Sequence, residues 1–302
     1  MRLSFINILK INSNKTIDIS RKTIFEKKPR IAVLIHGEIR TNSLGKGTND
    51  SFVYTFKNCF LTDKIINNYE VNIFFVVDKC IPEKVYDYFG VYLKGLLQLD
   101  KENIKEPLNV QQYIDNYMYY YDYRNINTEK FPYPTRSREI QLYSEYKRYC
   151  AWYLMQEYEK LVGIKYNYIF TTRPDVYFTN DIFNYIKELE NGKQLLNHHD
   201  WGFFGKNDIM CHLLKIIFVY GKYMYNEIDH PNEVIDKLSH SVVSKYKDIC
   251  KNIWPCWRES AECQVFEHLL QYYYINNLAS EDFGNMNIIV LYHDRREHVD
   301  WD

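Results

Sequence analysis

Two continuous apolar runs constrain most strongly what this chain can fold into. They are RIAVLIH (residues 30–36) and VNIFFVV (residues 71–77). Strands of this composition are typically buried on both faces, as in parallel sheets that helices cover. A third strand-like run, YNYIF (166–170), follows a long helical pattern. This alternation of strands and helices predicts an α/β fold with a mostly parallel central sheet and helices on both faces.

Hydrophobic periodicity places the other elements around these strands. Helices are expected over residues 51–68, 81–97, 137–162, 180–191, 208–225 and 264–274, and a last strand over residues 287–292. In the longest helix, the apolar face also includes Lys147 and Glu157. Residues 1–29 are interpreted as an N-terminal arm or edge strand, and residues 30–302 as a single domain.

The composition limits the classes of partner. The net charge is −1, so no global field attracts nucleic acid or an anionic membrane surface. The seven cysteines include no CxxC pair, which argues for reduced thiols and against a zinc site. The N-terminus lacks a signal-peptide pattern, and no apolar run approaches the roughly 20 residues of a membrane span. We therefore expect a cytoplasmic protein without a membrane span. The 29 tyrosines fit either a sugar or base site or an AT-rich genome.

The segment TTRPDVYF (171–178) interrupts apolar sequence with charge. Arg173 and Asp175 flank Pro174, which has no backbone donor and restricts the residue before it. Ligands bind at the carboxyl ends of strands in open α/β sheets, where a carboxylate can hold a divalent cation and an arginine can clamp a phosphate. The alternative is a surface turn with a local ion pair.

Polar residues also follow the first two expected strands. Gly37 ends the first strand, and a glycine there lets a ligand approach the backbone closely. Arg40 either meets a pyrophosphate or is a solvated turn residue. Asp78 ends the second strand, where an acidic residue commonly meets a ribose hydroxyl or a base edge, although it can also cap a helix.

Four further candidates lie in the C-terminal third. Asp200 precedes WGFFG (201–205), whose glycines let the chain bend under a ligand. Glu262 lies near the start of the helix expected over 264–274, beside two tryptophans, and is either a general base for a sugar hydroxyl or a capping residue. His293 can complete a metal shell and Arg295 can neutralise a diphosphate, unless this end is only a charged tail.

Together these segments resemble a family of glycosyltransferases of large DNA viruses and bacteria with a GT-A-like (Rossmann-like) fold. The resemblance spans about residues 30–300 and rests on IHGEIR (35–40), TTRPDVYF (171–178), DWGFFG (200–205) and SAECQVFEHLL (260–270). TTRPDVYF, an R-x-D variant of the family's D-x-D motif, is the most specific of the four. The abundant Ile, Asn, Lys and Tyr also resemble a giant-virus protein of glycan biosynthesis, which implies the host cytoplasm or the virion.

The resemblance implies transfer of a sugar from a nucleotide sugar to a hydroxyl of a glycan or glycoprotein, assisted by Mn²⁺ or Mg²⁺. Asp175 would be the metal ligand, and Tyr177 stands where the family's motif has a second aspartate. His293 or water would then complete the metal shell, or arginines would take the metal's role.

The other site residues follow from the same resemblance. Asp200 would face the donor or acceptor sugar, and Glu262 would be the base of an inverting reaction. The residues expected near the nucleotide and its diphosphate are Gly37, Arg40, Asp78, Arg173 and Arg295.

Two other functions fit the sequence. A sugar nucleotidyltransferase would use the loop GKGT (45–48) on a nucleoside triphosphate and release pyrophosphate. A non-catalytic glycan-binding protein would keep the fold without the chemistry, as Tyr177 suggests.

Overall fold

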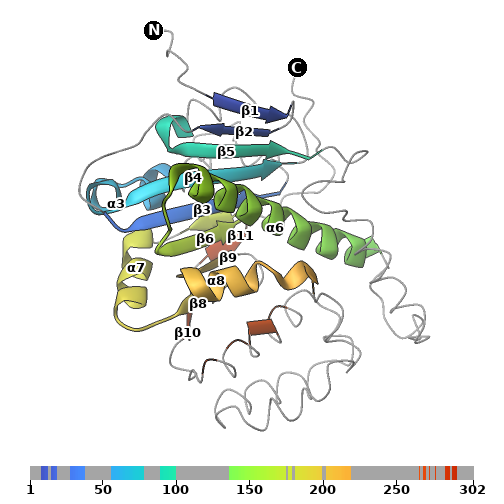
Figure 1. The fold of residues 1–302 in the computed structure, drawn as a ribbon. Coiled ribbons are helices and arrows are strands. Elements are labelled where there is room, and N and C mark those ends of the chain that lie inside the picture. The colour runs from blue at the N-terminus through green and yellow to red at the C-terminus, as the bar shows by residue number, and fades with distance from the viewer. Residues whose placement is uncertain are drawn as a thin grey trace, which may run out of the picture.

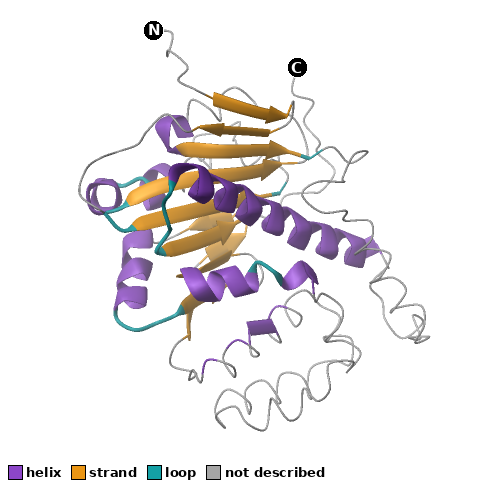
Figure 2. Ribbon diagram, in the orientation of Figure 1, coloured by secondary structure: helices purple, strands orange, loops and turns teal. Residues whose placement is uncertain are grey.

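A nine-stranded mixed sheet organises the part of the chain that the computed structural model describes (Figures 1 and 2). That part comprises residues 8–12, 15–18, 28–37, 56–77, 89–99, 136–174, 176–178, 181–198, 202–218, 265, 268, 269, 272, 276, 283–285 and 288–290. The strands are β1 (Ile8–Asn12), β2 (Lys15–Asp18), β3 (Arg30–His36), β4 (Glu70–Val77), β5 (Leu93–Gln98), β6 (Tyr168–Thr172), β8 (Leu195–His198), β9 (Gly202–Lys206) and β10 (Phe283–Asn285).

The strand order is β1-β2-β5-β4-β3-β6-β9-β8-β10. Within this sheet only β2 and β9 run against the other strands. The prediction of a mostly parallel sheet is therefore confirmed. Residues 8–18 supply β1 and β2, which form an antiparallel pair at the edge beside β5.

Helices cover both faces of the sheet, as predicted (Figure 2). On one face lie α6 (Arg136–Val162) and α8 (Asn207–Leu213). On the other lie a π-helical turn (Phe56–Phe60), α3 (Asp63–Asn68) and α7 (Ile182–Glu190). The short strand β7 (Val176–Phe178) also packs on this second face and pairs with β11 (Ile288–Val290).

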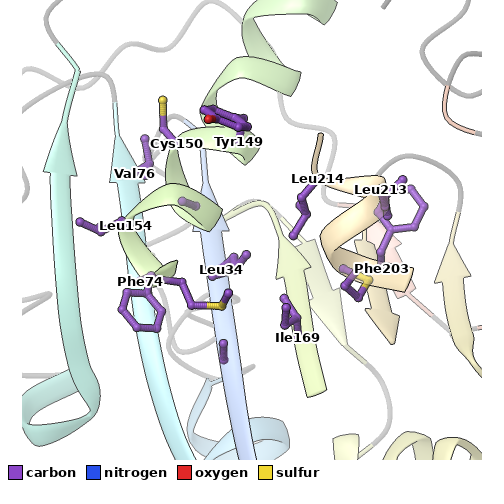
Figure 3. Close-up of a cluster of buried hydrophobic side chains, with 14 of the residues drawn as sticks. Leu34, Phe74, Val76, Tyr149, Cys150, Leu154, Ile169, Phe203, Leu213 and Leu214 are labelled. Atoms are coloured by element: carbon purple, nitrogen blue, oxygen red, sulfur yellow. The ribbon is translucent and has the colours of Figure 1, made fainter. Parts of the chain in front are cut away.

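The side chains of β3 show why its sequence is apolar throughout. Ala32 and Leu34 pack in the core beneath α6, whereas Val33 and Ile35 pack in the core on the opposite face. Alternate residues of a strand point to opposite faces, so both sets must be apolar when both faces are covered. Figure 3 shows the α6 side of this core, where Leu154 lies with Leu34 and other strand residues.

The helix expected over residues 81–97 is wrong in its C-terminal part. Residues 93–98 form the strand β5, which pairs with β4 on one side and β2 on the other. Leu93, Leu96 and Leu97 have the i, i+3, i+4 spacing of a helical stripe, but they divide between the two cores, with Leu93 and Leu96 on one face and Leu97 on the other. Gly95 also fits a strand beneath a close helix, because a Cβ atom there would lie 2.7 Å from Leu154 Cγ.

The helix expected over residues 51–68 is interrupted in its described part. The π-helical turn ends at Phe60, and α3 begins at Asp63. Between them Thr62 has an extended backbone (φ −70°, ψ 154°), which a continuous helix would not allow.

Most other boundaries agree with the predictions. The long helix expected over 137–162 is α6, and the one expected over 180–191 is α7, which Asp181 caps by accepting a hydrogen bond from the backbone N–H of Phe183. β11 lies within the last expected strand. The helix expected over 208–225 is wrong beyond its first part, because α8 ends at Leu213 and a turn and a 3₁₀ turn (Ile216–Phe218) follow it, while residues 219–225 lie outside the described residues.

Candidate functional site

The order of the parallel strands creates a topological switch point between β3 and β6. From β3 the chain adds β4 and then β5 on one side, and α6 then carries it back across the sheet to β6 on the other side. Both β4 and β6 pair with β3 in parallel. In open α/β sheets, ligands bind outside the carboxyl ends of the strands at such a point. The candidate site therefore lies where β3 and β6 end.

The chain segments that leave these two strands are in contact. Gly37 follows β3 with φ +128°, a conformation open to glycine but strained for other residues. Its backbone N–H donates to the carbonyl oxygen of Val76 on β4 at 3.1 Å. A Cβ atom at position 37 would lie 3.4 Å from Cδ of Pro174, which follows β6. Arg173, between β6 and this buried proline, is half-buried.

A buried polar cluster lies beside this junction, on the α6 face. His36 ends β3 and is fully buried. Its Nε2 accepts a hydrogen bond from Nε of Arg148 on α6 at 3.3 Å. Nη1 of Arg148 donates to both carboxylate oxygens of Glu145, at 2.9 and 2.8 Å. The guanidinium also lies over the Phe203 ring of β9, 5.1 Å from its centroid. Helix α6 thus holds a charged pair against the end of β3.

Burial, together with nearby positive charge, keeps the imidazole of His36 neutral. Burial lowers the pKa of His36 well below its usual value. Positive charges lower it further, and in order of effect they belong to Arg148, Lys147 and Arg173. Lys147 is buried, as its position on the apolar face of the helix suggested, and its Nζ lies 4.6 Å from the centroid of the Tyr143 ring. Cations on α6 and at the end of β6 thus favour the uncharged form of His36, and the carboxylate of Glu145 balances the charge of Arg148.

Buried polar atoms at the ends of β3 and β6 have no hydrogen-bond partner among the described residues. They are Nδ1 of His36 and Oγ1 of Thr171 on β6. Side chains alternate along a strand, and Ile169 of β6 belongs to the core beneath α6, so Thr171 faces the same side. Both atoms therefore lie on one face of the sheet, at the ends of two neighbouring strands.

The structure describes two of the nine predicted site residues. Gly37 and Arg173 both lie at the switch point, one after β3 and the other after β6. Outside the described residues lie Arg40, Asp78, Asp175, Asp200, Glu262, His293 and Arg295. Within the described ranges, no group of three or more His, Cys, Asp or Glu side chains is arranged to hold a metal ion.

The sequence interpretation missed His36, Glu145, Arg148 and Thr171. One signal was available for His36, because it ends an otherwise apolar strand just before Gly37. Glu145 and Arg148 have the i, i+3 spacing of an ordinary surface ion pair, and nothing in that spacing reveals burial. Their position depends on how α6 docks on the sheet.

The functional interpretation of this chain rests on the geometry of the candidate site. No protein-family model matches the chain, and no curated protein matches its sequence. Among the helices in the described ranges, none has the length and apolar character needed to cross a membrane.

Proposed function

We propose that this protein is a glycosyltransferase that moves a sugar from a nucleotide sugar to a hydroxyl of a glycan or protein. The observation that carries the proposal is the placement of two arginines at the switch point between β3 and β6, where Arg148 donates to His36 at the end of β3 and the half-buried Arg173 follows β6. Nucleotides bind at this position in doubly wound sheets. A diphosphate is the part of a nucleotide sugar that positive side chains recognise best.

The strand order supports the same function. Counted along the chain, the parallel strands β3, β4, β5 and β6 lie in the order third, second, first, fourth. This is the order at the centre of dinucleotide-binding sheets. It is compatible with the GT-A-like fold that we propose for the domain.

The chemistry of sugar transfer gives the cations a role. When the bond between the sugar and the nucleoside diphosphate breaks, negative charge develops on the leaving phosphate oxygens. Positive groups fixed near those oxygens stabilise that charge without having to reorganise. Arg173 is suited to this role because it is half-buried and follows directly after β6.

The remaining roles come from the sequence resemblance. Asp175 supplies carboxylate oxygens, the ligand type that Mn²⁺ and Mg²⁺ prefer, and the ion would add positive charge at the diphosphate. Glu262 or Asp200 would accept the proton of the attacking hydroxyl. These assignments belong to the proposal, because all three residues lie outside the described ranges.

A donor screen tests the proposal. The full chain is incubated with the common nucleotide sugars, with and without Mn²⁺, and the released nucleotide is identified. We expect one donor to yield a nucleoside diphosphate. Release of pyrophosphate from a nucleoside triphosphate and a sugar phosphate would instead identify a nucleotidyltransferase, and glycan binding without nucleotide binding would identify a binding protein.

Two variants connect the activity to the switch point. Arg173→Ala and Asp175→Ala should each reduce turnover at least about 100-fold, since the first removes a positive group from the diphosphate and the second removes the proposed ligand of the metal ion. Arg30→Ala is the matched control. Arg30 begins β3, so it lies at the end of the strand away from the candidate site, where its Nε donates to Glu70 at 2.8 Å. Full activity of both folded site variants would refute the proposal.

A further inference from the structure

The hydrogen bond from Arg148 determines which nitrogen of His36 carries the proton. Nε of Arg148 can only donate, so Nε2 of His36 must offer a lone pair. A neutral imidazole with an unprotonated Nε2 carries its proton on Nδ1. His36 therefore presents a buried Nδ1–H donor with no acceptor among the described residues.

A buried donor without an acceptor is rare in proteins, because it loses its bonds to water and gains nothing in return. The missing group must be an acceptor. The carboxylate of Glu145 balances the charge of Arg148, whereas Lys147 and Arg173 add positive charge that acts on the imidazole, so an anionic oxygen suits the position better than a neutral one. The hydroxyl of Thr171, buried on the same face at the end of β6, can donate a second hydrogen bond.

We propose that His36 is a ligand-binding residue whose neutral Nδ1–H donates to a phosphate oxygen of the nucleotide, with Thr171 as a second donor. This inference rests on the proposed function and adds the residues that donate hydrogen bonds to the diphosphate. Arg148 acts as a positioning residue, because it fixes the tautomer and orientation of the imidazole. Glu145 in turn fixes Arg148 through both carboxylate oxygens.

Three substitutions at position 36 separate this role from simple packing. The amide nitrogen of Asn can occupy the place of Nδ1, whereas the amide of Gln extends to the place of Nε2, and Leu offers neither group. Binding of inorganic pyrophosphate and of the common nucleoside diphosphates is measured by calorimetry. We expect His36→Asn to bind within about threefold of the wild type, and His36→Leu and His36→Gln to bind about tenfold or more weakly. Thr171→Val should weaken binding by a smaller factor.

The pH dependence gives a second readout. Because the donor is a neutral imidazole, the ratio of wild-type to His36→Asn affinity should stay constant between about pH 6 and 8, although the ligand itself titrates there. A ratio that rises toward pH 6 would show that a charged imidazole binds the ligand, and it would overturn the proposed tautomer. Thermal unfolding without ligand identifies any variant that has lost its fold.

The outcomes distinguish this inference from the proposed function. Sugar transfer together with unchanged diphosphate affinity in folded His36→Leu would refute the role of His36 and leave the transferase intact. Pyrophosphate binding that follows the expected variant order, without transfer from any donor, would support the subsite and refute the transferase. A wild-type chain that binds no diphosphate would refute both.

Discussion

Burial separates two ion pairs that share the same spacing along a helix. Glu145 and Arg148 on α6 each have 2% of their side-chain surface exposed, whereas Lys187 and Glu190 on α7 have 52% and 33%. In the buried pair, loss of one partner leaves the other charge buried without the counter-ion that balanced it. In the exposed pair, water replaces the lost partner.

We therefore expect Glu145→Gln to lower the free energy of unfolding by about 3–5 kcal/mol, since removing one partner of a buried pair is strongly destabilising. Lys187→Gln is the matched control and should cost less than about 1 kcal/mol. Urea unfolding at neutral pH measures both changes. Equal effects of the two substitutions would contradict the burial of the α6 pair.

Single residues show what sequence reasoning could find at this scale. Gly37 and Arg173 were recognisable because each follows an obvious strand, and strand ends are where polar residues gather in α/β sheets. Arg148 was not recognisable, because its burial requires the contact with His36, 112 residues away along the chain. Local patterns carry no information about such contacts.

At the scale of elements, α6 can pack closely on β5 because Gly95 has no side chain. A Cβ atom on Gly95 of β5 would lie 2.7 and 2.8 Å from Cγ and Cδ2 of Leu154, and 2.8 Å from Cδ1 of Phe74. Alanine in place of glycine usually stabilises a strand by roughly 0.5–1 kcal/mol. The steric overlap here acts in the opposite direction, because real Cβ atoms do not approach neighbours this closely.

Gly95→Ala should therefore destabilise the protein by about 1–3 kcal/mol, the usual cost of overpacking a core. Leu154→Ala alone should cost about 2–5 kcal/mol, because it leaves a cavity. In the double variant the two effects should partly cancel, giving a favourable coupling of roughly 1 kcal/mol in a urea double-mutant cycle. Simple additivity would mean that α6 does not pack on Gly95.

The same contact explains which elements the sequence could predict. β3, β4 and α6 follow from uniform apolar runs or a clear helical stripe, and their boundaries agree within one residue. β5 was expected to be helical, and the leucines of LKGLLQ do have the i, i+3, i+4 spacing of a helix. Its place between β4 and β2, beneath Leu154, is set by tertiary packing, which overrides weak local preference.

At the scale of the whole molecule, a pair of histidines connects α8 to the helical residues near the C-terminus. Nε2 of His212 donates to the carbonyl oxygen of His268 at 2.9 Å, and Nε2 of His268 donates to that of His212 at 2.8 Å. The two rings stack with centroids 4.0 Å apart. Val265 and Leu269 anchor the same segment in the core beneath α6. Contacts far apart in sequence thus complete one face of the fold.

This pair makes the stability of the protein depend on pH. Burial lowers the pKa of His268 to about 3, helped by repulsion from His212, and burial also lowers the pKa of His212, with a smaller effect from the charge of Lys215. Unfolded histidines titrate near 6.5, so below that pH the unfolded chain binds protons that the native chain does not. The contribution of the two neutral histidines to the free energy of unfolding is therefore fully present above pH 6.5. It is lost as the pH falls toward the native pKa values, by up to about 1.4 kcal/mol per pH unit for each histidine.

We expect His268→Gln to flatten this dependence. The Gln amide can still donate to the carbonyl oxygen of His212, but it does not titrate and cannot repel that imidazole. Chemical unfolding at pH 8, 6, 5 and 4 should show the wild type losing stability more steeply than the variant, while the two differ least in slope above pH 6.5. The buried His36 acts in the same direction, so the variant should keep part of the slope. Identical slopes in both proteins would mean that the pair does not stay neutral, and that the contact between α8 and the C-terminal residues does not set the acid stability of the fold.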